Sequence, residues 1–323
     1  MIDLNDTISV GVARKSVEAS GIVSFELVSL DGGELPPFVP GAHIDIHIPG
    51  GYVRQYSLCN AANDSGRYVV AILRDAHSRG GSAAMHDVVR EGDTLQISAP
   101  RCHFPLHAEA GSNLLIAGGI GVTPLLCMAD QLHREHRPFT FHYCTRSKER
   151  MAFHDAILNS AWAREARFHF DDGAIDQKLN LDAVLGAAKQ DAHLYVCGPQ
   201  GFMDSVLDTA RATGWEQNRL HYEYFKHDFI QKADDTSFEV EVASTGTVVI
   251  IPPGKSIAAV LNEHGFNVSM SCEQGVCGTC VTRVLSGTPD HRDSFLLPDE
   301  HEANDQMTPC CSRSKSPRLV LDL

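Results

Sequence analysis

The sequence lacks long hydrophobic runs, a basic amino-terminal segment and an excess of positive charge. No apolar run approaches the roughly 18–20 residues that a membrane-spanning helix needs. The first residues, MIDLNDTISV, have neither the basic start nor the apolar core of a signal peptide, so we expect a cytoplasmic protein. The formal net charge of −14 argues against nucleic acid or an anionic membrane surface as partner. This charge suits a basic protein partner, or simply a soluble acidic enzyme.

The ten cysteines are not distributed as in a disulfide framework. Half of them stand singly among apolar residues, where a free thiol usually acts as a small hydrophobe. These are Cys59, Cys102, Cys127, Cys144 and Cys197. The other half crowd into residues 272–311. In a cytosolic chain such a group indicates a metal or cofactor site rather than disulfides.

Two patterns of predicted secondary structure follow one another in the first 225 residues. Short strand-like runs separated by Gly, Pro, Asp and Asn fill residues 7–99, with one helix near Ser82–Arg90, and predict a small closed barrel. Strand-like and helical segments alternate from Asn113, which predicts a parallel sheet covered by helices on both faces. The expected helices are Pro124–Glu135, Ala152–Ser160, Leu181–Ala188 and Gly201–Thr213.

The remaining residues predict a third, smaller part. Phe229–Thr236 is polar and charged and is interpreted as a linker. Two strand-like runs follow it, then a short helix at Ser256–Glu263, the cysteine-rich loop and a strand-like carboxyl end. We therefore expect a β-barrel domain at 1–106, an α/β domain at 107–228, the linker at 229–236 and an α+β domain at 237–323.

The cysteine-rich loop has the spacing of an iron–sulfur site. Cys272-x4-Cys277-x2-Cys280 is followed 30 positions later by Cys310, which is the plant-type pattern of four thiolate ligands to a [2Fe-2S] cluster. Gly275 and Gly278 are expected to let the loop wrap closely around the inorganic sulfides. A zinc site is the alternative, but zinc knuckles favour two separated Cys-x2-Cys pairs. Cys311 adjoins Cys310, and neighbouring strand residues point to opposite sides; the spacing of 29 intervening residues favours Cys310 as the fourth ligand.

Two segments of the predicted barrel suit a flavin mononucleotide. In Arg54-Gln55-Tyr56-Ser57-Leu58, alternation places Arg54, Tyr56 and Leu58 on one face of a strand. An aromatic ring can stack on an isoalloxazine, a hydroxyl can reach its N5 region, and an arginine can neutralise a phosphate. Ser78-Arg79-Gly80-Gly81-Ser82 precedes a helix and predicts an anion site. Plain packing of a strand tyrosine is the alternative reading of the first segment.

Two glycine-containing turns predict a dinucleotide site. Gly118-Gly119-Ile120-Gly121-Val122-Thr123-Pro124 follows a strand and opens a helix, as in the turn that lies beneath a pyrophosphate. Cys197-Gly198-Pro199-Gln200-Gly201 forms a second turn of this kind. Both turns follow strands of the predicted parallel sheet, at the edge where such sheets bind ligands. Arg146, which follows another strand, is interpreted as a cation near the adenosine ribose.

Together these motifs resemble the phthalate dioxygenase reductase family, which includes the reductase components of vanillate demethylases and related Rieske oxygenases. The resemblance covers nearly the whole chain, including the aromatic end Glu223-Tyr224-Phe225. It implies a ferredoxin–NADP reductase-like module followed by a plant-type ferredoxin domain of the β-grasp type. It also implies FMN rather than FAD, NADH as the electron donor and a Rieske oxygenase as the protein partner. NADPH stays an alternative donor.

The resemblance also implies roles for individual residues. Ser57 is expected near the flavin N5, Thr123 and Cys197 near the nicotinamide, and Phe225 near the flavin ring. Packing is the alternative for Cys197 and Phe225. The residues expected to bind flavin or nicotinamide are Arg54, Gln55, Tyr56, Ser57, Leu58, Arg74, Gly80, Gly81, Ser82, Gly119, Gly121, Thr123, Pro124, Arg146, Cys197, Gly198, Pro199 and Phe225.

The implied chemistry needs no acid–base triad. A hydride carries two electrons and a [2Fe-2S] cluster takes one, so a flavin between them must hold a pair and release single electrons. The 17 histidines are accordingly read as surface or satisfied core residues. A self-contained reductase acting on a small acceptor, and a non-enzymatic metal-binding module, are the alternatives to an oxygenase reductase.

Overall fold

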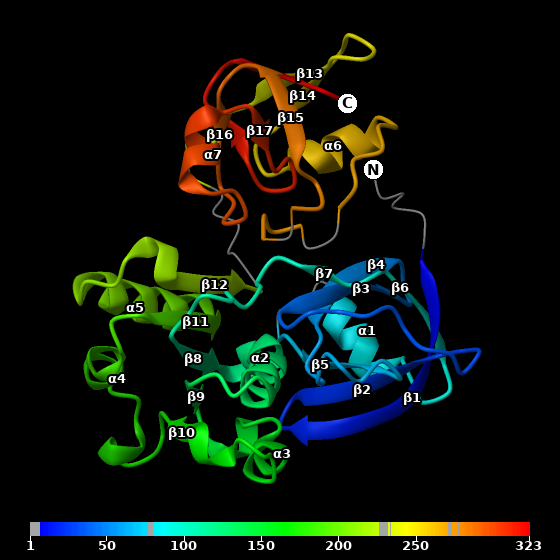
Figure 1. Cartoon of the computed structure of the whole chain (residues 1–323). Helices are drawn as coiled ribbons and strands as arrows, with labels where there is room; N and C mark the ends of the chain where they lie inside the picture. The colour runs from blue at the N-terminus through cyan, green and yellow to red at the C-terminus, as the bar shows by residue number, and fades with distance from the viewer. Residues whose placement is uncertain (1–6, 77–79, 226–231, 233, 271–272, 277) are drawn as a thin grey trace. The chain divides into compact units, whose positions relative to one another are not determined.

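The computed structural model describes residues 7–76, 80–225, 232, 234–270, 273–276 and 278–323. The chain divides into two compact units, residues 1–225 and 226–323 (Figure 1). The two sheets predicted as separate domains at 1–106 and 107–228 thus lie in one compact unit up to Phe225. In the described parts of the chain, no helix is long and apolar enough to cross a membrane.

The amino-terminal half of unit 1 is a closed antiparallel barrel. Its strands follow the order β4-β3-β6-β1-β2-β5, and β7 pairs with β3. The two edges meet where Leu58, just after β4, forms an antiparallel bridge to Val70 of β5. The bounds are β1 Ile8–Ala19, β2 Ile22–Ser29, β3 Ala42–Ile48, β4 Tyr52–Ser57, β5 Tyr68–Leu73, α1 Gly81–Asp87, β6 Thr94–Ile97 and β7 Arg101–Cys102. The predicted barrel is confirmed.

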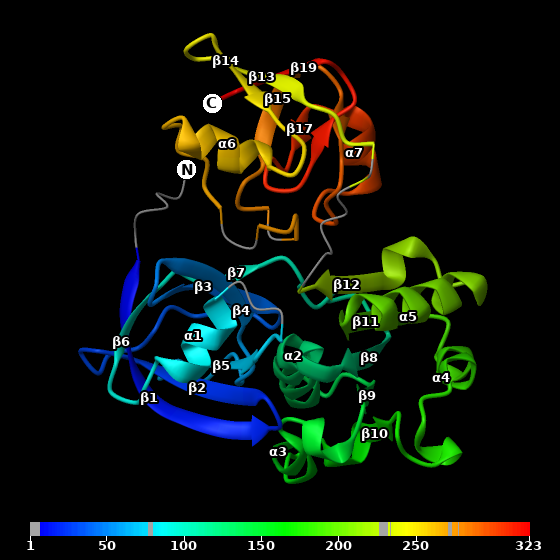
Figure 2. The ribbon, with the colours of Figure 1, turned by 180° about the vertical axis from the view of Figure 1, so that it is seen from behind.

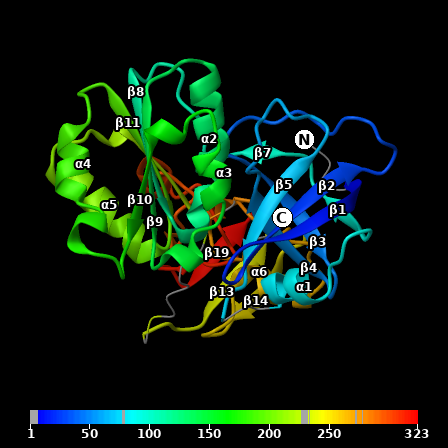
Figure 3. The same cartoon turned by 90° about the horizontal axis from the view of Figure 1, so that it is seen from below.

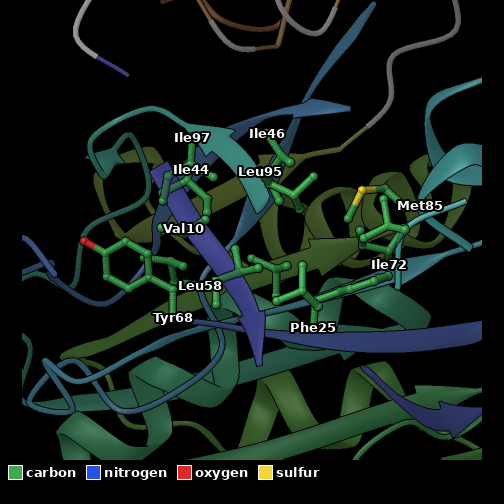
Figure 4. Packing of buried hydrophobic residues seen from close by; sticks show 14 of the residues in the cluster. Val10, Phe25, Ile44, Ile46, Leu58, Tyr68, Ile72, Met85, Leu95 and Ile97 are labelled. Atoms are coloured by element: carbon green, nitrogen blue, oxygen red, sulfur yellow. The ribbon is translucent and has the colours of Figure 1, made fainter. Parts of the chain in front are cut away.

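The barrel encloses one apolar core, shown in Figure 4. Side chains that alternate along the strands point inward, and Met85 of α1 joins them. Each fully buried side chain of this size contributes roughly 1.5–3 kcal/mol of transfer free energy. The largest members are Tyr68, Phe25, Leu27, Ile44, Ile46, Leu58, Ile72, Met85 and Ile97. This core fixes the position of β4, on which the predicted flavin motif lies.

The second half of unit 1 is an entirely parallel sheet in the order β10-β9-β8-β11-β12. Figure 3 shows α2 and α3 on one face and α4 and α5 on the other. The strands are β8 Ser112–Gly118, β9 Phe139–Thr145, β10 Ala166–Phe170, β11 Ala192–Gly198 and β12 Leu220–Tyr224. The helices are α2 Val122–Arg134, α3 His154–Leu158, α4 Leu181–Ala187 and α5 Gln200–Ala212. Single 3₁₀ turns are η1 Gly119–Gly121, η2 Lys148–Arg150, η3 Ala163–Glu165, η4 Ile175–Gln177 and η5 Gln217–Arg219.

Both faces of the central strands are apolar, as a sheet between two helical layers requires. Leu115 and Ala117 of β8 pack toward α2, whereas Leu114 and Ile116 pack toward α5. Among the described helices that cover this sheet, only α3 is clearly shorter than its predicted span. Phe153 precedes it with φ +59°, a left-handed conformation that no helix can run through.

Unit 2 is a mixed sheet with the order β14-β13-β19-β15-β17, plus a small β16–β18 pair (Figure 2). Helix α6, α7 and a shared apolar core accompany this sheet. The bounds are β13 Phe238–Val242, β14 Thr247–Ile251, α6 Ile257–Glu263, β15 Thr282–Ser286, β16 Pro289–Asp290, α7 Pro298–Ala303, β17 Gln306–Met307, β18 Arg313–Ser314 and β19 Arg318–Leu321. The predicted strand pair, helix and final strand are present.

The last residues of the predicted linker are bound to unit 2. Arg292 donates to the Asp235 carboxylate at 2.9 Å, and Arg313 donates to the Thr236 carbonyl at 3.0 Å. These partners hold the pKa of Asp235 below its usual range, the Arg292 hydrogen bond being the largest cause. Half of the predicted linker, residues 229–231 and 233, lies outside the described residues.

Candidate functional site

The predicted flavin strand β4 carries polar side chains next to the parallel sheet. It pairs with β3 so that Gln55 lies beside Asp45 and Ser57 beside His43. The Ser57 hydroxyl donates to Glu223 Oε2 of β12 at 3.4 Å, while Leu58 points into the barrel core. The alternation predicted for this segment is therefore confirmed at Ser57 and Leu58. Tyr56 is half-buried against the core, and burial raises the pKa of its hydroxyl.

One buried donor on this strand has no protein partner. Among the described residues, the side-chain amide nitrogen of Gln55 is shielded from solvent and makes no hydrogen bond. An unsatisfied buried donor costs about 1–3 kcal/mol unless a ligand or water accepts from it. Together with the nearby Ser57 hydroxyl, this donor fits the polar edge of a flavin ring, and both residues would hold that edge.

Two glycines let α1 approach β4 closely. Gly80 has φ +101°, and a Cβ there would overlap the ring of Tyr52. A Cβ on Gly81 would lie 2.8 Å from Cγ of Arg54. The Arg54 guanidinium lies over the Tyr52 ring at 5.8 Å and donates to the Val53 carbonyl at 2.7 Å. The predicted phosphate segment and the predicted phosphate arginine are thus brought together.

Other predicted members of the phosphate segment are placed differently or not described. Ser78 and Arg79 lie outside the described residues. The Ser82 hydroxyl accepts from the backbone N–H of Asp75 at 3.2 Å. Arg74 forms an ion pair with Asp87 of α1, so it stands at the exposed side of this helix. That ion pair raises the pKa of Arg74 and gives it a structural role in α1.

The two glycine-containing turns of the parallel sheet are packed directly against each other. A Cβ on Gly121 would overlap the backbone of Cys197 and lie 2.5 Å from the nitrogen of Gly198. A Cβ on Gly198 would lie 3.0 Å from Cα of Gly118. Side chains larger than hydrogen are therefore excluded where β8 and β11 end. This is the carboxyl edge of the sheet, where the sequence predicts the nicotinamide.

The remaining predicted nicotinamide residues surround these turns. Thr123 is buried in the first turn of α2, where its hydroxyl donates to the Ile120 carbonyl at 3.1 Å. Pro124 follows it, and Pro199 precedes α5. The exposed Arg146 follows β9, whose last paired residues lie beside Gly118 of β8. Gly119 adopts φ +53° at the start of the first turn.

A buried carboxyl group that the sequence analysis noted only as part of a motif completes this edge. Glu223 of β12 lies beside Cys197 of β11 and accepts from Ser57. The residue keeps some accessible surface, but its carboxyl group is desolvated, which raises its pKa to about 8. Burial, followed by the Glu223 charge, raises the pKa of the Cys197 thiol well above its ordinary value. Phe225 packs against the same core beyond Glu223.

Ser57, Cys197 and Glu223 therefore join the barrel to the parallel sheet at one point. Of these three residues, Ser57 was predicted to lie near the flavin ring and Cys197 near the nicotinamide ring. Glu223 could have been found from the strand pattern LHYEY. Alternation places Glu223 on the same side of β12 as Phe225, and a carboxyl group on an apolar side of a strand is unusual unless it has a specific partner.

The described cluster ligands also lie together in unit 2. Cys280 and Cys310 are both buried, and their thiols are within hydrogen-bonding reach of each other. The other two predicted ligands, Cys272 and Cys277, lie outside the described residues. Cys311 is also buried, but its sulfur contacts the Thr308 hydroxyl at 3.2 Å. The Cys310 thiol is also within reach of the Cys311 thiol, and Cys280, Cys310 and Cys311 all belong to the core of unit 2. The donor set fits a cluster, and the choice of Cys310 as the fourth ligand stays a prediction.

The glycines of the cysteine loop are required by protein packing. Gly278 has φ +69°, and a Cβ there would overlap the Phe295 ring. Gly275 has φ +70°, and a Cβ there would lie 2.7 Å from Cβ of Asp293 and overlap Cys311 Sγ. The close approach of both glycines to inorganic sulfides stays a prediction. Among the described residues, the neighbours that exclude side chains are Phe295, Asp293 and Cys311.

Comparisons with known proteins agree with this arrangement. The family model "2Fe-2S iron-sulfur cluster binding domain" matches residues 240–315, and "Dimethylamine monooxygenase subunit DmmA-like, N-terminal domain" matches residues 99–220. Vanillate O-demethylase oxidoreductase of Pseudomonas sp. (strain HR199 / DSM 7063) is 51% identical over 98% of this chain and 100% of its own length. Tetrachlorobenzoquinone reductase of Sphingobium chlorophenolicum is 37% identical over 98% of both chains.

The fold comparison leads to the same group of proteins. The structure of phthalate dioxygenase reductase, described as modular for electron transfer from pyridine nucleotides to [2Fe-2S], is similar with a TM-score of 0.78. The two sequences are 40% identical, and the match covers 99% of this chain and 98% of the other. The barrel, the parallel sheet and the ferredoxin unit are thus all matched. The chain belongs to the phthalate dioxygenase reductase family of flavin- and [2Fe-2S]-dependent oxidoreductases.

Proposed function

We propose that this chain is the reductase component of a two-component Rieske oxygenase or demethylase, with FMN as its flavin and NADH as its electron donor. The observation that carries the proposal is the union of three sites in one chain: the Ser57–Glu223 junction, the paired glycine turns and the buried cysteine pair. Bound flavin would accept a hydride from the nicotinamide and release its electrons singly. The protein's own residues would bind the flavin and the nicotinamide, orient the two rings and exclude water from them.

The paired turns set the approach of the donor. Gly121 and Gly198 let the two turns pack directly against each other, and glycine-containing turns at the carboxyl edge of a parallel sheet are typical of pyrophosphate and nicotinamide binding. Thr123 and Cys197 lie at the same edge as Ser57, across the Glu223 carboxyl group. A thiol with a raised pKa is neutral at physiological pH, so Cys197 would contact the nicotinamide without adding charge or acting as a nucleophile.

The ends of β9 and β10 support NADH over NADPH. Asp171 and Asp172 are exposed and follow β10, and their backbone N–H groups donate to the carbonyls of Thr145 and Arg146 at 3.1 Å each. Two carboxylates beside the position proposed for the adenosine ribose would repel a 2′-phosphate. Arg146, which follows β9, is a cation at the same edge. Comparing kcat/KM for NADH and NADPH tests this, and equal values would refute the donor preference.

FMN is proposed from the compact phosphate segment around Arg54, Gly80 and Gly81. Acid extraction of the purified protein followed by chromatography should yield FMN in a 1:1 ratio to the chain. Recovery of FAD would refute this part of the proposal and would leave the cluster assignment intact.

The partner is proposed to dock partly through charge. The net charge of −14 would steer a partner with a basic docking surface, and salt would screen that attraction. The decisive experiment is reconstitution with a Rieske oxygenase encoded beside this chain. The full chain should drive its turnover, and the rate should fall as ionic strength rises. Failure to support the oxygenase at any salt concentration would refute the proposed partner.

A second candidate function is direct reduction of a small acceptor such as a quinone. The relative from Sphingobium chlorophenolicum is named a tetrachlorobenzoquinone reductase and matches nearly the full chain. Turnover of a quinone that exceeds turnover with any Rieske oxygenase would favour this candidate.

A further inference from the structure

Three histidines meet at the amino-terminal edge of the parallel sheet. His221 of β12 lies beside Tyr195 of β11, and His193 precedes Tyr195 by two residues, so all three rings are on one face. His107 comes from the segment between the barrel and β8. Its backbone N–H donates to the Tyr195 hydroxyl at 2.8 Å, which fastens this segment over the sheet.

The three imidazoles are in contact. His193 Nδ1 and His221 Nε2 are 2.8 Å apart, and the ring of His107 stacks on that of His221 with centroids 4.1 Å apart. One nitrogen from each ring lies within 4.8 Å of the other two. Nitrogens bound to one zinc ion at 2.0–2.1 Å stand roughly 3.4 Å apart in a tetrahedral site. Ring rotations on the order of 1 Å at the nitrogen would close the group around an ion.

The rings of His193 and His221 are in the protonation state that a metal ligand needs. Burial, followed by the neighbouring His107 and His193, lowers the pKa of His221 to about 3. Burial likewise lowers the pKa of His193, with the charge of His107 as the next cause. Both are neutral at physiological pH and have lone pairs to offer.

We propose that His107, His193 and His221 bind one divalent transition-metal ion of the imidazole-preferring class, represented by Zn²⁺. Three imidazole nitrogen donors and an open fourth position are typical for such ions. No residue of the group belongs to the flavin, nicotinamide or cluster sites.

The charged groups around the three histidines affect the affinity of this site for a metal ion. The Arg137 guanidinium hydrogen-bonds the His107 carbonyl, and Arg219 donates to the Gln190 carbonyl at 2.6 Å; both repel a cation. The Asp191 carboxylate raises the pKa of His193, and its negative charge would attract a cation. The ion would therefore be held mainly by coordination, and its affinity would fall as acid protonates the imidazoles.

The location indicates a structural role. The strands are parallel, so His193 and His221 stand at the opposite end of β11 and β12 from Cys197 and Glu223. An ion bound there would clamp the connecting segment at His107 to the sheet, and it would stabilise unit 1 without touching the reacting groups.

Zinc binding by the intact, cofactor-loaded full chain tests the proposal. Equilibrium dialysis against Zn²⁺, followed by elemental analysis, should give one more zinc per chain for wild type than for His107→Gln. Since His107 is exposed, this variant should fold and keep its iron content. Zinc held by thiolates would be common to both proteins and would cancel in the difference.

The matched control is His169→Gln. His142 and His169 form a similar stacked pair, with ring nitrogens 3.0 Å apart, but no third metal-ligating side chain joins them within the described residues. Zn²⁺ should raise the melting temperature of wild type and His169→Gln, and should do so less for His107→Gln. Equal zinc content and equal thermal shifts in wild type and His107→Gln would overturn the proposal.

Discussion

Replacing Glu223 with Gln should remove a pH-dependent destabilisation of unit 1. The pKa of this carboxyl group is raised to about 8 in the folded protein, chiefly by burial, from about 4.3 in an unfolded chain. Between these values the folded state binds a proton that the unfolded state has released. The free energy of unfolding therefore falls as pH rises from about 4.3 to 8. Gln keeps the shape and an acceptor for Ser57 but cannot ionise.

The size of the effect follows from the pKa difference. Each pKa unit corresponds to about 1.4 kcal/mol, which gives an upper bound of about 5 kcal/mol at high pH. Because Glu223 keeps some accessible surface and its surroundings can relax, we expect about 2 kcal/mol. For a unit of this size that corresponds to a gain of roughly 4–8 °C in melting temperature. At pH 5 the two proteins should have nearly equal stability.

Thermal unfolding of wild type and Glu223→Gln between pH 5 and 9 measures this difference. Glu109→Gln, which changes an exposed carboxylate, is the matched control and should follow wild type throughout. The reasoning is refuted if the curves of wild type and Glu223→Gln stay parallel, or if they diverge toward acid instead of toward alkali.

Two further predictions rest on glycines that contact neighbouring groups. Gly278→Ala should lower the free energy of unfolding of unit 2 by roughly 2–4 kcal/mol, because it combines a positive φ with overlap on Phe295. The control is Gly246→Ala, at a similar φ with no atom within 4 Å of a Cβ, which should lower it by only about 1 kcal/mol. Unfolding monitored by cluster absorbance compares them, and equal losses would contradict the packing argument. Gly121→Ala should weaken pyridine-nucleotide binding at least tenfold through its overlap with Cys197, and unchanged KM and kcat for the donor would count against the proposed site.

The elements that the sequence predicted well are those with a strong local period. The barrel strands and the alternating strands and helices of residues 113–225 read directly from apolar spacing, because each has one or two buried faces. The short pieces of unit 2, such as β16 Pro289–Asp290 and β18 Arg313–Ser314, are two-residue ladders. Only tertiary pairing defines them, so no sequence window could indicate them.

The functional site was predictable where it depends on spacing and less so where it depends on contact. The spacing of the cysteines and of the glycines in the sequence is enough to indicate which of them belong to the predicted sites. The strand pattern LHYEY could indicate the position of Glu223, but its contact with Ser57 and the meeting of His107 with His221 join segments far apart in the sequence. No local pattern predicts these contacts. Arg74 was predicted from the sequence to bind a cofactor, but its guanidinium forms an ion pair with Asp87 of α1. This contact also could not be read from the sequence.

The central claim is that electrons leave the flavin through a cluster held in part by Cys310. Cys310→Ser and Cys311→Ser, two adjacent buried positions, should be compared by rapid mixing with NADH and by turnover of a Rieske oxygenase. We predict that both variants reduce their flavin at the wild-type rate, that only Cys310→Ser lacks the cluster signal, and that only Cys310→Ser fails to drive the oxygenase. Full oxygenase turnover by cluster-free Cys310→Ser would contradict the account.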